Sequence, residues 1–186
     1  MKLKAQGAFE YMISYGWAIL IVIVLGILLF SLGVLNPSQT PSANGFTILR
    51  PVSWSFSGGN ADESNVTIAL ENVAGQSLVL YVNDTDEQSI KFKKGSSLPC
   101  YFSNSTSITV TDNAGNTVPV TANKVSVPVG GIITISGKID GYGNGTANSN
   151  CGGLVNAGYR YDVQLVVKDE YQITKKDNGL ITGRFV

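Results

Sequence analysis

The side chains that could perform chemistry in this chain are few and widely spaced. Its 186 residues include no histidine, which removes the commonest general base and the commonest metal ligand. The cysteines do not have the spacing of a metal site, and no glycine-rich phosphate loop follows a predicted strand. We therefore predict no catalytic residue, no metal site and no cofactor, and we do not expect an enzyme.

Two acidic segments come nearest to a cation site. The segment that begins at Asp140 resembles a calcium loop only at its start, because its twelfth position, which needs a bidentate glutamate, is Cys151. Asp84, Asp86 and Glu87 could form a local cation site, but a solvated acidic turn is the more frequent structure for such a run. We therefore expect no metal at either segment.

The aromatic residues suggest two different environments. Trp54 and Phe56 alternate with serines, as core residues of a strand do, although a carbohydrate platform is the alternative. We expect exposed aromatic side chains near the loops, at Tyr142, at Tyr159 and in the pair Tyr101-Phe102.

Cys100 and Cys151 are the only cysteines. In an exported domain, two cysteines are best interpreted as a disulfide. Closing a loop of about 50 residues would stabilise the fold by about 3–4 kcal/mol on the chain-entropy model. It would also fix the Gly- and Asn-rich segment 141–153. Two free thiols in a reducing environment are the alternative.

Four asparagines lie in the N-x-Ser/Thr pattern, which is an N-glycosylation acceptor only in an exported chain. A domain rich in asparagine and threonine also produces this pattern by chance. We expect at least one site to carry a glycan, with Asn104 and Asn144 favoured because they lie in predicted loops. The four candidates are Asn65, Asn83, Asn104 and Asn144.

The main element of the chain is the stretch from Gln6 to Leu35. No charged residue occurs between Met12 and Leu35, and a helix of roughly 20 apolar residues is long enough to cross a bilayer. The run is longer than the core of a cleavable secretory signal, and no A-x-A cleavage pattern follows it. We predict a long hydrophobic transmembrane helix that stays with the mature protein. Lys2 and Lys4 would place its N-terminus in the cytoplasm.

Glu10 is the exceptional residue of this stretch, because it places a carboxylate at the start of an otherwise apolar helix. A lone ionised group inside a membrane costs several kcal/mol and usually has a partner. Helix geometry leaves two placements open for Glu10. It lies either at the level of the lipid headgroups, in contact with water, or in apolar surroundings with a cationic partner.

The residues around Glu10, from Lys4 to Tyr11, read KAQGAFEY. They resemble the class III signal peptide of archaeal type IV pilin-like proteins. The resemblance implies a leader over residues 1–5 that is cleaved between Ala5 and Gln6. It also implies the acid at the fifth mature position, Glu10, and the aromatic Tyr11 after it. Ala8 departs from the pattern, which often has serine there, and the resemblance covers only the N-terminal stretch.

The resemblance also implies how subunits assemble. The helices of type IV pilin-like proteins bundle into a filament core, where Glu10 of one subunit would neutralise the free amino group of Gln6 on a neighbour. A buried charge pair is tolerated where an unpaired charge is not, so this pair would favour one axial register. The residues implied in assembly are Gln6, Glu10 and Tyr11. The implied partners are copies of the same chain in a helical filament, the prepilin peptidase and the pilus assembly machinery.

After a linker rich in proline and serine over residues 36–45, the apolar pattern changes to a period of two. A turn at Ala74-Gly75 predicts a hairpin, and residues 112–116 predict another turn. We predict an α+β chain, in which the hydrophobic helix over residues 6–35 precedes an antiparallel β-sandwich head of Ig-like or pilin type over residues 46–186. The alternating apolar residues are Val52, Trp54 and Phe56, then Val66, Ile68 and Leu70, then Leu78, Leu80 and Val82, and later Tyr161, Val163, Leu165 and Val167.

The charge of the chain excludes one class of partner. It contains 13 basic and 13 acidic side chains, which is not basic enough to suggest binding of nucleic acid. With the resemblance, we expect a pilin, the structural subunit of an extracellular type IV-like archaeal pilus with a role in adhesion. It would be inserted in the membrane as a precursor and then assembled on the cell surface. The alternative is a minor pilin or a single-pass, membrane-anchored surface binding protein that does not polymerise.

Overall fold

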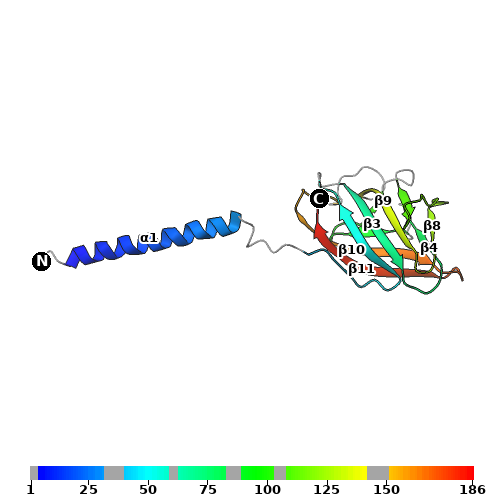
Figure 1. The fold of residues 1–186 in the computed structure, drawn as a ribbon, viewed down its shortest axis with the longest axis horizontal. Helices are drawn as coiled ribbons and strands as arrows, with labels where there is room; N and C mark the ends of the chain where they lie inside the picture. The colour runs from blue at the N-terminus through cyan, green and yellow to red at the C-terminus, as the bar shows by residue number, and fades with distance from the viewer. Residues whose placement is uncertain (1–3, 32–39, 59–62, 83–88, 103–107, 142–150) are drawn as a thin grey trace. The chain divides into compact units, whose positions relative to one another are not determined.

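The computed structural model describes residues 4–31, 40–58, 63–82, 89–102, 108–141 and 151–186, and within the helix it describes the side chains of residues 15–29. The chain divides into two compact units, Met1–Ser38 and Gln39–Val186. The first contains helix α1 (Lys4–Ser31), and the second contains the strands (Figure 1). These strands are β1 (Ser42–Asn44), β2 (Leu49–Phe56), β3 (Ser64–Asn72), β4 (Leu78–Tyr81), β5 (Lys91–Lys93), β6 (Cys100–Phe102), β7 (Thr109–Asp112), β8 (Lys124–Val127), β9 (Ile132–Gly141), β10 (Gly158–Lys168) and β11 (Thr174–Arg184).

Helix α1 has 28 residues and is shorter than the predicted helix over residues 6–35. It begins at Lys4, so the last two residues of the predicted leader are helical, and residues 32–35 lie outside the described part of the chain. From Gly16 to Leu29 every residue is apolar. Over these residues the helix is apolar on all sides, whereas a helix packed on a globular core has one apolar stripe.

The head is built from one continuous antiparallel sheet of 11 strands. Along its main path the order is β1-β11-β10-β5-β6-β9-β3-β2, while β4 pairs with β10 and β8, and β7 pairs with β9. The three-residue strands β5 and β6 pair with each other and connect β10 to β9. The antiparallel head is therefore confirmed, but these two short strands join the predicted two layers of a sandwich into a single curved sheet.

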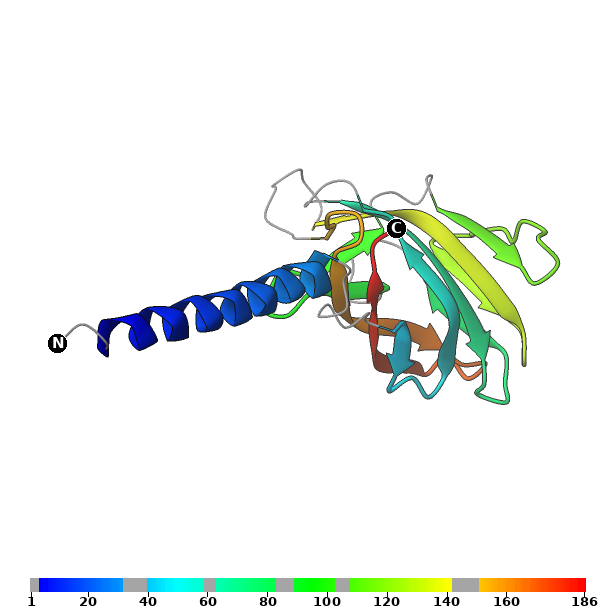
Figure 2. The same cartoon turned by 60° about the vertical axis from the view of Figure 1, so that its left-hand side comes forward.

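The sheet curls so that its edge strand β2 approaches the C-terminal strand β11, and the strands surround one common interior (Figure 2). The indole N–H of Trp54 on β2 donates to the carbonyl oxygen of Thr182 on β11 at 3.2 Å. The backbone N–H of Val186 donates to the oxygen of Phe56 at 2.9 Å, and the N–H of Gly58 donates to the oxygen of Val186 at 2.8 Å. These bonds nearly close the sheet on itself and enclose one core.

The alternation of apolar and polar residues in the sequence predicts most of the buried side chains of the core correctly. The predicted apolar positions of β3, β4 and β10 are buried. Val52 is the exception, because its side chain is 43% exposed. A β-bulge between Pro51 and Ser53 inserts Val52 as an unpaired residue, which shifts the alternation of β2 by one position. Phe56, beyond the bulge, is buried, and Trp54 is half-buried.

Two other predictions about the order of elements are wrong. The turn at Ala74-Gly75 does not join a hairpin, because β3 pairs with β2 and β9, whereas β4 pairs with β8 and β10. The predicted linker over residues 36–45 contains β1, which pairs with β11 from Ser42 to Asn44. The head therefore includes residues before Phe46, since an edge strand needs only three residues to add to a long neighbour.

An aromatic cluster fills one end of the core. The rings of Phe56 and Tyr161 stack with their centroids 5.0 Å apart, and the ring of Phe92 meets Phe56 edge-on at 5.8 Å. Glycine at position 183 leaves room for the ring of Tyr159, because a Cβ atom at Gly183 would lie 2.4 Å from the Tyr159 hydroxyl oxygen. The cluster consists of Phe56, Phe92, Phe102, Tyr159, Tyr161 and Phe185.

A buried carboxylate fastens the start of β2 to β11. Asp177 is 2% exposed. Its Oδ1 accepts bonds from the backbone N–H and the hydroxyl of Thr47 at 2.9 and 3.0 Å. Its Oδ2 accepts from the backbone N–H groups of Ile48 and Leu49 at 2.8 and 2.9 Å. Both oxygens are thereby satisfied, as burial of a carboxylate requires.

Candidate functional site

The residues of the predicted processing motif all lie in helix α1. Ala5, Gln6, Glu10 and Tyr11 fall within Lys4–Ser31, while their side chains lie outside the described residues. Cleavage before Gln6 and pairing of Glu10 therefore stay predictions. Because Lys4 and Ala5 are helical, cleavage at this site would require the first turn of the helix to open.

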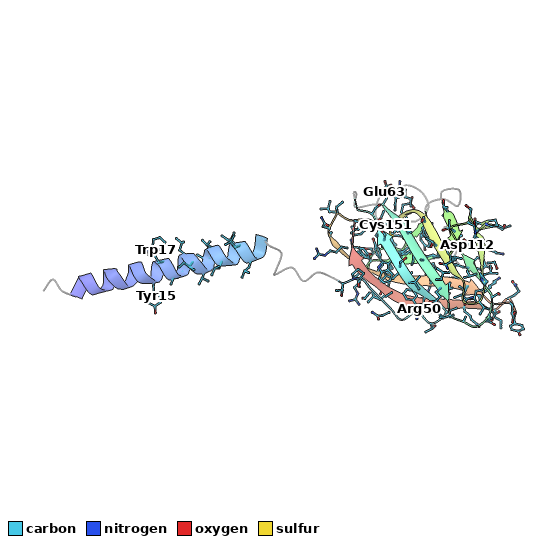
Figure 3. All side chains as sticks on the ribbon, viewed as in Figure 1. Tyr15, Trp17, Arg50, Glu63, Asp112 and Cys151 are labelled. Carbon is cyan, nitrogen blue, oxygen red and sulfur yellow. A yellow bond between two sulfur atoms is a disulfide. The ribbon has the colours of Figure 1, made fainter. Side chains whose placement is uncertain are left out.

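The described part of α1 exposes a continuous apolar surface. Trp17, labelled in Figure 3, is 64% exposed, and Val22 is 68% exposed. Further along the helix, Ile27 is 63% exposed. Within the described residues, no helix is both long and apolar enough to cross a membrane.

The predicted disulfide is confirmed. Cys100, at the start of β6, is bonded to Cys151, with Cα atoms 5.7 Å apart, and both residues are buried. The hydroxyl of Tyr161 donates to the carbonyl oxygen of Cys151 at 2.6 Å. The bridge and this hydrogen bond join the segment that begins at Cys151 to the aromatic cluster (Cys151 is labelled in Figure 3).

One of the four glycosylation candidates is described. Asn65 lies on β3 with an exposed side chain, and its backbone partner across the ladder is Lys138 on β9. Thr67, the third residue of its acceptor pattern, is hydrogen-bonded through its hydroxyl to Ser136 at 3.1 Å. Asn83, Asn104 and Asn144 lie outside the described residues.

The predicted exposed aromatic residues are not exposed where the structure describes them. Tyr101 is 7% exposed, Phe102 is 1% and Tyr159 is 3%. These residues border polar loops in the sequence, but β6 and β10 carry them into the sheet. Tyr142 lies outside the described residues. Tyr171, at the turn between β10 and β11, is exposed instead, at 73%.

The acidic residues that the sequence suggested for a cation site are not assembled into one in the described part of the chain. Asp84, Asp86 and Glu87 lie outside it. Asp140, on β9, is described. Within the described ranges, no group of three or more His, Cys, Asp or Glu side chains could hold a metal ion.

A cleft on the solvent side of the head was not foreseen from the sequence. It has a volume of about 680 Å³ and lies over β5, β10 and β11, beside the end of β1. Its polar lining includes Lys91, Lys93, Asp162, Gln164 and Asn178. Sequence alternation marks these residues only as solvent-facing, because β5 lies far from β10 and β11 in the chain.

Comparison with known proteins gives no family. No family model matches the chain, and no curated protein matches it. Among solved structures, it is similar to target SoR45 of the Northeast Structural Genomics Consortium, with 9% identity over 76% of this chain and 82% of that chain. The TM-score is 0.30, so this similarity supports no conclusion about fold or function.

Proposed function

We propose that this chain is a pilin, the structural subunit of an extracellular type IV-like filament. The observation that carries the proposal is the sequence KAQGAFEY at the start of helix α1, whose residues from Gly16 to Leu29 are all apolar. The leader of residues 1–5 is removed, Gln6 becomes the new N-terminus, and the helix then enters the core of the filament. In the precursor, the apolar stretch that ends at Leu35 holds the chain in the membrane.

The apolar surface of α1 supports this proposal. Exposed apolar surface of this extent marks a membrane or protein contact. In a bundle of such helices, each helix buries the side chains of its neighbours, and burial contributes about 25 cal/mol per Å² of apolar surface removed from water. Glu10 then has a partner in the Gln6 amino group of an adjacent subunit, which removes the cost of an isolated buried charge.

The head supports a role outside the cell. A disulfide in a small β-domain fits an oxidising compartment. The head would decorate the filament surface and meet other surfaces, which is the basis of the proposed adhesive role.

Substitution of Glu10 tests the assembly step separately from processing. In the Glu10→Gln variant, the leader is removed as in the wild type, but the amount of filament sheared from cells falls at least tenfold, because the Gln6 amino group is left without a counter-charge. Glu170→Gln is the matched control on the exposed surface of the head, and it assembles normally.

Wild-type amounts of filament from the Glu10→Gln variant would contradict the proposed pairing. A wild-type chain that is processed but never found in filaments would instead indicate a minor pilin or a surface-anchored binding protein.

A further inference from the structure

Among the described residues, one side of the head carries more lysines than acidic side chains. The solvent-facing positions of β4, β5, β8, β10 and β11 include several lysines and a single described acidic residue, Asp162, which lies across the ladder from Lys93. Among the described residues, none of these lysines forms an ion pair. The lysines are Lys91, Lys93, Lys124, Lys168 and Lys176.

The cleft of about 680 Å³ lies within this basic surface. Lys91 and Lys93 line it from β5, Gln164 from β10 and Asn178 from β11. The register of the sheet pairs Lys91 with Gln164, and Gln164 with Asn178, in one row across three strands. The polar groups therefore stand on rigid, hydrogen-bonded strands and not on loops.

The two amides of the cleft are already oriented. The side-chain nitrogen of Gln164 donates to the side-chain oxygen of Asn178 at 2.8 Å. This bond leaves the oxygen of Gln164 as an acceptor and the nitrogen of Asn178 as a donor. Leu180 and Pro99 add apolar lining. The cleft thus combines positive charge, oriented amides and a small apolar area.

The basic surface continues along β10 beyond the cleft. The ammonium groups of Lys124 and Lys168 lie 5.3 and 5.6 Å from the centre of the Tyr81 ring. Lys168 is two outward positions along β10 from Gln164, so the surface is longer than a single monosaccharide. An extended ligand with repeating negative charges matches it better than a small anion does.

We infer that this cleft and the adjacent lysines bind an acidic polysaccharide, a polymer of uronic acid units. The lysines pair with sugar carboxylates, the amides of Gln164 and Asn178 bond to hydroxyl groups, and the apolar lining contacts the C–H face of a sugar ring. Asp162 accepts a bond from a further hydroxyl. The inference concerns the head alone and does not depend on whether the helix polymerises.

Binding of polygalacturonate to the full-length protein in non-ionic detergent tests the inference. We expect binding that weakens with added salt, because surface charge pairs are screened. Neutral dextran of similar length does not bind. The Lys91→Ala/Lys93→Ala variant loses about tenfold in affinity, because two of the positive charges that face the polymer are removed. Lys138→Ala, on β9 and outside the cleft, is the matched control and keeps wild-type affinity.

A second double variant tests whether the cleft recognises sugar hydroxyl groups in addition to negative charge. Gln164→Ala/Asn178→Ala weakens binding of polygalacturonate but leaves the weaker binding of polyaspartate unchanged. Thermal unfolding of every variant at the wild-type temperature excludes loss of fold as the cause.

Several outcomes would overturn the inference. One is the absence of polygalacturonate binding by the wild type, and another is equally tight binding of polyaspartate, which would show a non-selective charged surface. An equal loss in the Lys138→Ala variant would place binding elsewhere. Self-association that disappears in the Lys91→Ala/Lys93→Ala variant, without polysaccharide binding, would make a second copy of this chain the occupant. Failure to form filaments would not affect these measurements, because they use the solubilised chain.

Discussion

At the scale of single residues, Asp177 links the first part of the head to its last strand. Four hydrogen bonds from Thr47, Ile48 and Leu49 converge on its two oxygens. No spacing in the sequence distinguishes this aspartate from the exposed acids, because its partners lie more than a hundred positions earlier in the chain. Its role depends on the pairing of β1 with β11 and on the path from β1 into β2.

The Asp177→Asn variant tests this role. An amide keeps one acceptor oxygen but turns an NH₂ group toward two donors, so we expect the free energy of unfolding to fall by about 2–3 kcal/mol. Urea denaturation at pH 7 measures it. Asp162→Asn, at an exposed position, is the control and changes stability by less than about 0.5 kcal/mol. Equal stability of both variants would show that the four bonds contribute little.

Tyr159 gives the head a defined response to alkaline pH. Burial raises the pKa of its phenol to about 12, although a hydrogen bond with Trp54 acts in the opposite direction. Burial also raises the pKa of Tyr161, and the neighbouring Tyr159 raises it further. The neutral phenols are therefore favoured in the folded state.

The sign of the pH effect follows from this shift. The stability that Tyr159 contributes is complete below the unfolded pKa of about 10 and is lost as pH rises toward 12, by about 1.4 kcal/mol per pH unit. Urea denaturation between pH 8 and pH 11.5 measures the slope. In the Tyr159→Phe variant the free energy of unfolding falls less steeply with pH, because one titrating group is missing. An unchanged slope would show that other groups cause the loss of stability at alkaline pH.

At the scale of elements, the disulfide joins β6 to the segment that leads into β10. Its cysteines are 51 positions apart, so the closed loop includes β7, β8 and β9. The Cys100→Ser/Cys151→Ser variant is expected to lose about 3–4 kcal/mol of stability on the chain-entropy model.

Chemical denaturation with and without a reductant measures this loss. The reductant should destabilise the wild type and leave the variant unchanged. If the wild type were equally stable under both conditions, the disulfide would have no stabilising role.

The strands of the head show which features of the fold the sequence can predict and which it cannot. Alternation in β3 and β10 reports which side chains face inward, and there the predictions hold. It does not report which strand lies alongside, so the turn at Ala74-Gly75 was mistaken for a hairpin between β3 and β4. It also fails at Val52, where one inserted residue reverses the pattern.

The predicted exposure of aromatic residues next to polar loops is wrong for a related reason. Tyr101 and Tyr159 follow or precede Gly- and Asn-rich segments, which suggested exposure. Their strands are internal to the sheet, however, since β6 lies between β5 and β9, and β10 lies between β11 and β5. Burial here is set by long-range pairing, and local composition does not contain that information. The disulfide could be predicted because the chain offers only one possible pair of cysteines.

At the scale of the whole molecule, equal numbers of basic and acidic side chains conceal an uneven distribution. The chain has 13 of each, yet the described solvent side of β4, β5, β8, β10 and β11 carries lysines opposed by one described acid. The polar cleft lies on this side. A neutral net charge therefore does not exclude a local surface that binds anions.

The whole chain also joins two parts with opposite solvent preferences. The head encloses its own core, whereas the described part of α1 exposes apolar side chains from Trp17 onward. The proposed filament satisfies both requirements, because copies of the helix cover one another while the heads stay in water.

The mature N-terminus tests the filament proposal most directly. Intact mass and N-terminal sequencing of the protein sheared from the surface of cells should give a chain that begins at Gln6, or at its cyclised pyroglutamate form. The same mass should be lower by two hydrogens for the Cys100–Cys151 bridge and higher by any glycan on Asn65, Asn83, Asn104 or Asn144. A surface chain that still begins at Met1 would contradict the proposal and would indicate a membrane-anchored binding protein.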